Sequence, residues 1–278
     1  MTLVIGASGT LGRILVPELL ARGEQVRVLT RDRSRIAEDR VEVVVGDVRD
    51  IAAVEEAMRG CEVVVLAAHG FVGPRGISPE TIDRDANIAA IGRAAAAGVR
   101  HIVLVSAYGA GPQHPMSLHR AKFAAERALS ASAVSWTIIR PAPFLETWTG
   151  IIGAHVDDRH QALVFGSGTN PIDFVRAAAV ADAIAEAVSE HPRRNRELDV
   201  TPRLARTFTE IAEEAVARAS TPARIRHVPL GMLRLLSHAA KPFSPSFARQ
   251  AHAAVVMNTT DMTVSDRCAP STAGKILG

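Results

Sequence analysis

The first twelve residues constrain the fold of this chain more than any other stretch. Leu3-Val4-Ile5 is a short apolar run that ends at a glycine, as expected for a buried strand of a parallel sheet. After Gly12, apolar residues recur at helical spacing as far as Gly23, which can take a left-handed C-cap. The stretch therefore predicts a strand, a tight turn and a helix whose N-terminus points backbone N–H groups at one spot that suits a phosphate.

Three glycines of this turn follow the spacing G-x-x-G-x-x-G. Gly6 would allow the turn, Gly9 would let the backbone approach a pyrophosphate, and Gly12 would let the helix pack closely on the strand. The alternative is a structural turn without a ligand. The flanking strand and amphipathic helix favour a dinucleotide site. We expect it to use these residues of the turn: Gly6, Ser8, Gly9, Thr10, Leu11 and Gly12.

Strand-like and helix-like segments alternate as far as residue 140, which predicts an α/β fold: a Rossmann-type doubly wound parallel sheet with helices on both faces. The expected strands are 3–5, 25–29, 41–45, 62–66, 101–105 and 136–139. The expected helices, after the first, are 50–58, 81–97 and 117–129. Residues 1–140 should therefore form an NAD(P)-binding core.

After residue 140 the alternation weakens, and prolines and glycines punctuate the chain. The pattern still indicates helices at 177–189, 209–219 and 231–240 and a late strand at 198–200. Thr207 and Thr209 compete to cap the second of these helices. We expect residues 141–278 to form a smaller substrate-side region that is not an independent domain.

Composition excludes several classes of function. The net charge is only +3 and the arginines are scattered, whereas nucleic-acid binding favours a clustered basic face. The densest run, Arg193 to Arg196, is interpreted as a solvated loop. Cys61 and Cys268 suggest neither a disulfide framework nor a metal site. Because the sequence opens on an expected core strand, we expect no signal peptide, and it has no apolar run of the ~20 residues that span a bilayer. We expect a cytoplasmic chain with a small-molecule substrate and no nucleic-acid or membrane partner.

The end of the second expected strand bears on the choice of cofactor. NAD-selective sites usually place an acidic residue there to hold the ribose 2′-hydroxyl. This chain has Thr30 and Arg31, with Arg33 close behind. Arginine suits a 2′-phosphate, so Arg31 and Arg33 favour NADP(H) over NAD(H). Asp32, if turned inward, would hold a ribose and reverse the preference.

The next two strand ends also offer cofactor contacts. Asp47 can accept a hydrogen bond from an adenine amino group, with the backbone at Val48 against the ring; alternatively, Asp47 caps a local turn. Ala67 and Ala68 are small enough to let the backbone pass close to a cofactor. His69 follows them, as a cofactor contact or as an ordinary loop histidine.

The fifth strand and the following helix carry the candidate catalytic residues. Ser106 ends the strand, and Tyr108 follows it. His119 and Lys122 are neighbours on the helix, and Lys122 could bind a nicotinamide ribose. The alternative is a surface ion pair between Lys122 and Glu126.

Together these motifs resemble the atypical short-chain dehydrogenase/reductases, in the NmrA-like NAD(P)-binding branch. The residues that carry the resemblance are Gly6–Gly12, Thr30–Asp32, Gly46–Asp50, Ser106–Gly109, Lys122–Glu126, Trp136–Pro141, Pro171–Val175 and Val180–Ile184. The resemblance covers most of the chain to about residue 215. It implies an NAD(P)(H) cofactor contacted by residues that include Ser106, Lys122 and Pro141.

The family's reductases carry a Tyr-x-x-x-Lys pair, in which tyrosine donates a proton and lysine holds the nicotinamide ribose. Lys122 matches the lysine, but Leu118 stands where the tyrosine belongs. Some relatives reduce quinones or conjugated dyes without that tyrosine; His119, Tyr108 or water could then assist a proton. Other members bind NADP as redox sensors and regulate a partner protein.

Two hypotheses follow for a chain that we expect to be a monomer or a homodimer. The first is an NADPH-dependent oxidoreductase of small, electron-poor substrates such as quinones. The second is a non-catalytic NADP(H) sensor or scaffold with a protein partner. A nucleotide-sugar epimerase or dehydratase is disfavoured because the Tyr-x-x-x-Lys pair is incomplete.

Overall fold

The computed structural model describes residues 1–73, 76–190, 195–201 and 205–264, and it divides the chain into two compact units. Unit 1 comprises Met1–Pro141 and Ala177–Val200, and unit 2 comprises Ala142–Arg176 and Thr201–Gly278. No helix within the described residues is long and apolar enough to cross a membrane.

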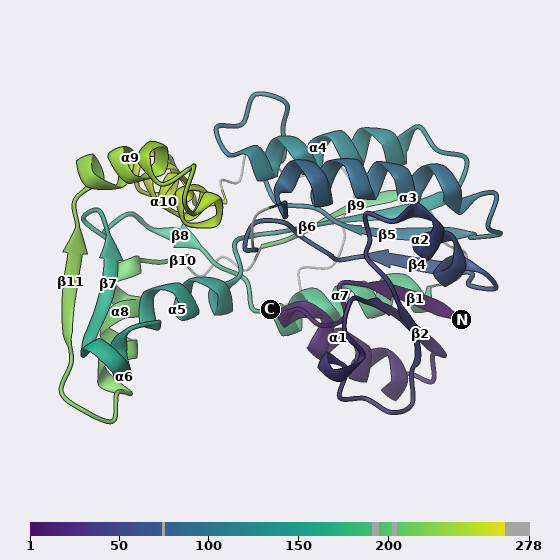
Figure 1. The fold of residues 1–278 in the computed structure, drawn as a ribbon, viewed down its shortest axis with the longest axis horizontal. Helices are drawn as coiled ribbons and strands as arrows, with labels where there is room; N and C mark the ends of the chain where they lie inside the picture. The colour runs from purple at the N-terminus through teal and green to yellow at the C-terminus, as the bar shows by residue number, and fades with distance from the viewer. Residues whose placement is uncertain (74–75, 191–194, 202–204, 265–278) are drawn as a thin grey trace. The chain divides into compact units, whose positions relative to one another are not determined.

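Unit 1 is built on a parallel sheet of seven strands in the order β3-β2-β1-β4-β5-β6-β9 (Figure 1). The strands are β1 (Thr2–Ile5), β2 (Val26–Thr30), β3 (Glu42–Val45), β4 (Val63–Leu66), β5 (His101–Val105), β6 (Ser135–Pro141) and β9 (Arg196–Val200). The chain winds outward from β1 in both directions, so the strand order reverses between β1 and β4. In doubly wound sheets this reversal opens a crevice for a dinucleotide. The expected Rossmann-type fold is confirmed.

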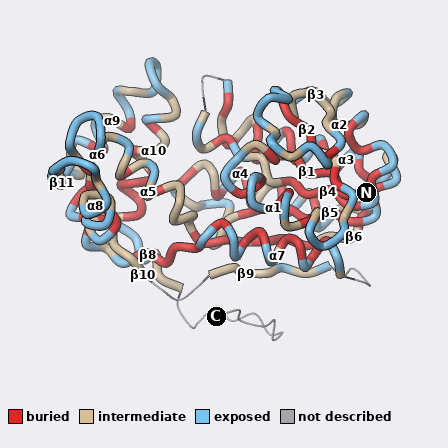
Figure 2. Tube along the Cα trace, turned by 90° about the horizontal axis from the view of Figure 1, so that it is seen from below, coloured by how far each residue is buried: buried red, intermediate tan, exposed pale blue. Residues whose placement is uncertain are grey.

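Helices cover both faces of this sheet (Figure 1). One face carries α2 (Ile51–Met58), α3 (Asn87–Ala94) and α4 (Ser117–Ser130). The other carries α1 (Thr10–Ala21) and α7 (Ala177–Ser189). Every residue of β1, β4 and β5 is buried (Figure 2). This burial on both faces explains why the three strands are largely continuous apolar runs in the sequence.

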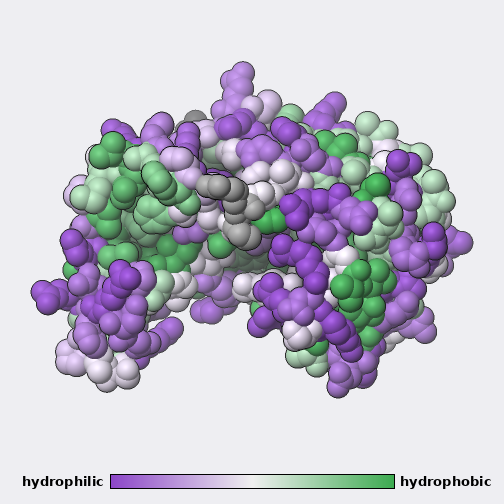
Figure 3. Space-filling view, in the orientation of Figure 1, coloured by the Kyte–Doolittle hydropathy of each residue, from purple (hydrophilic) through white to green (hydrophobic). Residues whose placement is uncertain are grey.

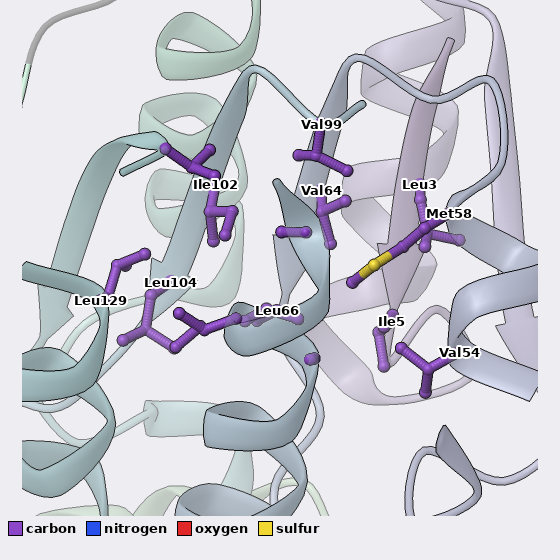
Figure 4. Packing of buried hydrophobic residues seen from close by; sticks show 14 of the residues in the cluster. Leu3, Ile5, Val54, Met58, Val64, Leu66, Val99, Ile102, Leu104 and Leu129 are labelled. Carbon is purple, nitrogen blue, oxygen red and sulfur yellow. The ribbon is translucent and has the colours of Figure 1, made fainter. Parts of the chain in front are cut away.

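The core on the α2–α4 face is a single apolar cluster (Figure 4). Leu3 and Leu66 from the central strands and Met58 from α2 are at most 1% exposed. Leu104 from β5 and Leu129 from α4 extend the cluster. This packing fixes the ends of β1 and β4, where the cofactor is expected.

The helix expected over 81–97 begins earlier and in another form. A π-helical turn, η2 (Pro79–Ala86), precedes α3 directly. Ser78 caps it through a reciprocal capping box with Thr81, and Pro79 occupies the first helical position. π-Helical turns are rare and occur frequently at functional sites.

Unit 2 contains two small sheets and five helices in its described part. Its elements are α5 (Leu145–Gly153), α6 (Val156–Arg159), β7 (Gln161–Phe165), β8 (Ile172–Asp173), β10 (Ala205–Arg206), α8 (Phe208–Ala217), β11 (Arg224–Val228), α9 (Leu230–Ala239) and α10 (Pro245–Thr259). Strands β7 and β11 pair in parallel, and β8 and β10 pair antiparallel. Trp148, Phe165, Phe174 and Phe208 form the aromatic part of its core. Thr207 caps α8, which settles the choice between Thr207 and Thr209.

The division of the chain differs from the expected boundary at residue 140. Segment Ala177–Val200 does not belong to the substrate side, because α7 packs on α1 and β9 pairs with β6 in unit 1. The expected strand at 198–200 is therefore part of the main sheet. The basic run at 193–196 lies partly outside the described residues; of it, Arg196 pairs with Glu190 at 2.5 Å.

Candidate cofactor site

A cleft of about 360 Å³ lies at the carboxyl ends of β1, β2, β3 and β4, next to the reversal of strand order. Unit 1 supplies all of its lining residues. The lining includes most of the predicted cofactor contacts, in this list: Gly6, Ser8, Gly9, Arg31, Asp47, Val48, Ala67, Ala68 and His69. Sequence spacing and topology therefore converge on one cavity.

Two of the turn glycines are required by close packing. Gly6 has φ +107, and a Cβ there would lie 2.6 Å from the backbone nitrogen of Ala68. A Cβ on Gly12 would lie 2.4 Å from the carbonyl oxygen of Gly6. Both contacts are with backbone atoms that cannot move aside. Gly6 therefore allows the turn after β1 to approach the backbone that follows β4, and Gly12 allows α1 to pack closely on the turn.

Gly9 differs from its neighbours because it is not needed for packing. The nearest atom to a Cβ on Gly9 is the Gly6 carbonyl oxygen, at an ordinary 3.4 Å. Gly9 is the N-cap of α1 and supplies no side-chain cap, so the first-turn amides of the helix remain available to a ligand. This is the arrangement that a pyrophosphate needs. Thr10, Leu11 and Gly12 are not among the cleft-lining residues, and Leu11 is buried.

The end of β2 brings positive charge to the cleft. Arg31 and Arg35 line it. Arg33, which shares a short 3₁₀ turn with Arg35, is not among the lining residues. Asp32 also lines the cleft, but its carboxylate accepts hydrogen bonds from the Ser34 amide at 2.9 Å and hydroxyl at 2.7 Å. These bonds lower the pKa of Asp32 and commit its carboxylate to capping the turn.

Asp47 caps a local turn, and its predicted contact with an adenine stays a prediction. It lines the cleft, and its carboxylate also accepts hydrogen bonds from the Arg49 backbone and guanidinium, at 2.7 to 2.9 Å. The Arg49 side chain lowers the pKa of Asp47 to about 2. Arg49 in turn donates to the Gly76 carbonyl at 3.3 Å. Asp47 therefore stays ionised as an acceptor and anchors a loop beside the cleft.

Lys122 makes a buried ion pair that the sequence did not reveal. Its ammonium lies 2.8 Å from the Asp83 carboxylate and donates to the Val105 carbonyl at 2.7 Å. Lys122 is 4% exposed and Asp83 is fully buried in η2. The alternative of a surface Lys122–Glu126 pair is wrong, because both side chains are buried and Glu126 has other partners.

Asp83 connects Lys122 to the wall of the cleft. Its second carboxylate oxygen accepts a hydrogen bond from the Gly70 backbone N–H at 2.8 Å. Gly70 follows directly on the lining residues Ala68 and His69. Lys122 itself is not among the lining residues, so contact between its ammonium and a ribose stays a prediction. An aspartate in the first turns of a helix is so common that only the tertiary structure marks this one as special.

Ser106 and Pro141 are also absent from the cleft lining. The Ser106 hydroxyl donates to Glu126 at 2.5 Å, and Arg140 forms a two-point contact with the same carboxylate at 2.7 and 2.8 Å. The carbonyl of Pro141 accepts from the Tyr108 amide at 2.8 Å. These contacts tie the ends of β5 and β6 together, and a contact of Ser106 or Pro141 with a cofactor stays a prediction.

His119 is buried as a neutral imidazole, which lacks the extra proton that an imidazolium would donate. Its ring stacks on His114 at a centroid distance of 3.9 Å. Burial lowers the pKa of His119 to about 3, so the ring is neutral near pH 7. Tyr108 contributes a backbone hydrogen bond to this ring and is only partly buried. Neither residue lines the cleft.

The buried neutral state of His119 should make stability depend on pH. Because its folded pKa lies below the unfolded value near 6.5, the contribution is complete above pH 6.5 and is lost as pH falls toward 3. Each pH unit within that window costs about 1.4 kcal/mol. In urea unfolding at pH 7 and pH 5, the wild type should lose about 2 kcal/mol more than His119→Leu. Equal losses in both proteins would contradict the burial of a neutral ring.

The comparisons with known proteins agree with this geometry. Residues 6–192 match a protein-family model described as NAD(P)H-binding. The chain belongs to this NAD(P)H-binding family. Its fold and neighbours are of the atypical short-chain dehydrogenase/reductase type. The match begins at Gly6, where the cofactor turn begins, and extends through α7.

Three individual proteins show what the chain is similar to. It is 26% identical to an NAD(P)H azoreductase from Xenophilus azovorans over 81% of this chain and 76% of that protein. It is 25% identical to Quinone oxidoreductase 2 from Escherichia coli over 77% of this chain and 73% of that protein. The structure of Citrobacter sp. triphenylmethane reductase complexed with NADP(H) superposes with a TM-score of 0.73 at 19% identity, covering 95% and 92% of the two chains.

Proposed function

We propose that this chain is an NADPH-dependent oxidoreductase that reduces small electron-poor substrates such as quinones. The observation that carries the proposal is the cleft at the reversal of strand order, where Gly9 leaves open space at the N-terminus of α1. The names of the similar azoreductase and quinone oxidoreductase support this class of substrate.

The residues present fit a dinucleotide phosphate cofactor. When bound, NADPH would supply a hydride from its nicotinamide ring. The amides that open α1 would hold its pyrophosphate, and Arg31 would pair with the 2′-phosphate. The Asp83–Lys122 pair would fix the backbone at Gly70 beside the reactive end. A quinone that takes a hydride and one proton from water becomes a hydroquinone, which balances the reaction.

The missing tyrosine determines which substrates we expect. Leu118 has no proton to give, and His119 is neutral near pH 7. A positioned general acid typically supplies ~10²–10⁴-fold, which reduction of simple ketones needs most. The oxygen of a reduced quinone is already a stabilised anion. The proposal therefore favours quinones and related conjugated acceptors.

A substrate panel tests the proposal. Purified protein with NADPH should oxidise the cofactor measurably with small quinones and hardly at all with simple aldehydes and ketones. The readout is the loss of nicotinamide absorbance, with protein-free mixtures as controls for direct chemical reduction. Efficient reduction of a simple ketone would show that another group replaces the tyrosine and would contradict our interpretation of Leu118.

The choice of cofactor gives a separate prediction. NADPH should bind at least about tenfold more tightly than NADH, a difference of about 1.4 kcal/mol. Arg31→Ala should remove most of this gap, because Arg31 lines the cleft and Asp32 is committed to Ser34. Arg40→Ala is the matched control, since Arg40 pairs with Glu38 and does not line the cleft. Titration calorimetry that gives equal wild-type affinities for NADPH and NADH would refute the preference.

A second candidate function is a non-catalytic NADP(H) sensor. Two observations favour it: Leu118 replaces the tyrosine, and the Lys122 ammonium is held by Asp83 and Val105. A sensor would bind NADPH as tightly as the proposed enzyme does. The two functions separate only on hydride transfer to an acceptor.

A further inference from the structure

Unit 2 carries a long stretch without acidic residues that the proposed reaction does not use. Residues 215–260 contain no aspartate or glutamate, although the whole chain has 29. The same stretch contains five arginines and one lysine. The stretch includes β11, α9 and α10, which carry four of these six cations: Arg224, Arg226, Arg234 and Arg249. Such a sign asymmetry indicates an anionic partner.

Large apolar side chains are exposed on the same elements. Met232 and Leu235, three residues apart on α9, are 52% and 67% exposed. Phe243 and Phe247, around the start of α10, are 85% and 42% exposed. Figure 3 shows apolar residues gathered over the α9 and α10 side of this unit. We call these four residues the apolar patch; patches of this kind mark interaction sites.

A basic cleft adjoins the apolar patch. It has a volume of about 230 Å³, and its lining includes Arg159, Arg226, His155 and His227 together with Met232. Asp158 lies 3.3 Å from His155 and 3.7 Å from Arg159 and offsets part of this charge. Arg226 forms no ion pair with a described residue. Guanidinium groups in a cavity of this size suit a phosphate group.

We propose that the apolar patch and the basic cleft together bind the surface of an anionic lipid membrane. The patch would enter the boundary of the acyl chains while the cleft takes a headgroup phosphate. Met232 belongs to both features, which places the phosphate site at the border of the apolar surface. Exposed apolar side chains beside guanidinium groups, on a stretch without acidic residues at 215–260, favour lipid over an acidic protein. The sequence-based expectation of no membrane partner rested on the absence of a spanning segment and did not address a peripheral surface.

Vesicle co-sedimentation of the full-length protein tests this proposal without reference to catalysis. The protein should pellet with vesicles of equal parts phosphatidylglycerol and phosphatidylcholine, and not with phosphatidylcholine alone. Arg226→Glu should weaken binding by about fivefold or more, and added salt should release the protein. Leu235→Glu combined with Phe243→Glu should abolish it. Ile88→Glu, at an exposed apolar position of α3 in unit 1, is the matched control and should bind as the wild type does.

Circular dichroism and NADPH affinity would show that each variant is folded. Three outcomes would overturn the proposal. The first is equal binding by the wild type and the Leu235→Glu/Phe243→Glu variant. The second is thermal stabilisation by inorganic phosphate without any vesicle binding, which would make the cleft a site for a free anion. The third is a wild type that forms a dimer and does not bind vesicles, together with a double variant that is monomeric. This result would show that the patch binds a second copy of the chain.

Discussion

Replacing Gly9 with valine should abolish NADPH binding, with a loss of at least about 100-fold in affinity, or about 2.7 kcal/mol. The valine side chain would occupy the space in front of the first turn of α1, where we place the pyrophosphate. The fold should survive, because a Cβ at Gly9 meets no atom closer than 3.4 Å. The backbone there, with φ −82 and ψ 174, is extended and open to valine.

Two other glycines complete this test. Gly92→Val is the matched control: Gly92 lies in α3, away from the cleft lining, and a Cβ there meets open space. It should bind NADPH as the wild type does. Gly12→Val should instead disrupt folding, because its Cβ would lie 2.4 Å from the Gly6 carbonyl. Calorimetric titration and far-ultraviolet circular dichroism separate these outcomes, and normal binding by Gly9→Val would make the turn purely structural.

Lys122→Met should destabilise the protein by about 3–5 kcal/mol, since it leaves the carboxylate of Asp83 buried without its counter-charge. Asp83 is fully buried, so water cannot replace the lost ammonium. The hydrogen bond from Gly70 to Asp83 would remain as the carboxylate's described partner. Any quinone reduction by this variant should also be slower, because the carboxylate that holds the Gly70 backbone next to His69 would lose the ammonium that positions it.

A double variant distinguishes an unpaired charge from lost packing. Asp83→Leu combined with Lys122→Met removes both charges and should recover much of the stability that Lys122→Met loses. Lys241→Met is the control, because Lys241 is exposed near the start of α10. Urea unfolding measures all of these variants. Stability of Lys122→Met within about 0.5 kcal/mol of the wild type would show that the pair does not support the fold.

The features predicted from the sequence are those specified by local patterns. The strand Leu3–Ile5 is a continuous apolar run that ends at a glycine, and Gly6 and Gly12 are required by backbone contacts that the spacing already implied. The cofactor cleft follows from strand order, because parallel strands bring their carboxyl ends to one edge. The sequence placed Arg31, Asp47 and Ala67–His69 at these strand ends, and all of them line the cleft; their contact with a cofactor stays a prediction.

The features that were missed depend on contacts between segments far apart in the chain. Asp83 lies 39 positions before Lys122, and no periodicity links an aspartate in a π-helical turn to a lysine on α4. Strand β11 reads Arg-Ile-Arg-His-Val and is largely exposed, so it lacks the apolar run of a buried strand. Helix α10 begins at a proline, Pro245, and so starts at one of the residues that punctuate this part of the sequence.

A single-turnover experiment tests the central claim most directly. The protein saturated with NADPH is mixed without oxygen with one equivalent of a small naphthoquinone, and nicotinamide absorbance is followed alongside product analysis. We predict loss of one NADPH for each hydroquinone formed, at a rate well above the protein-free mixture and absent from Gly9→Val. NADPH that stays bound and unoxidised in the presence of quinone would contradict the proposed reductase and would favour the sensor.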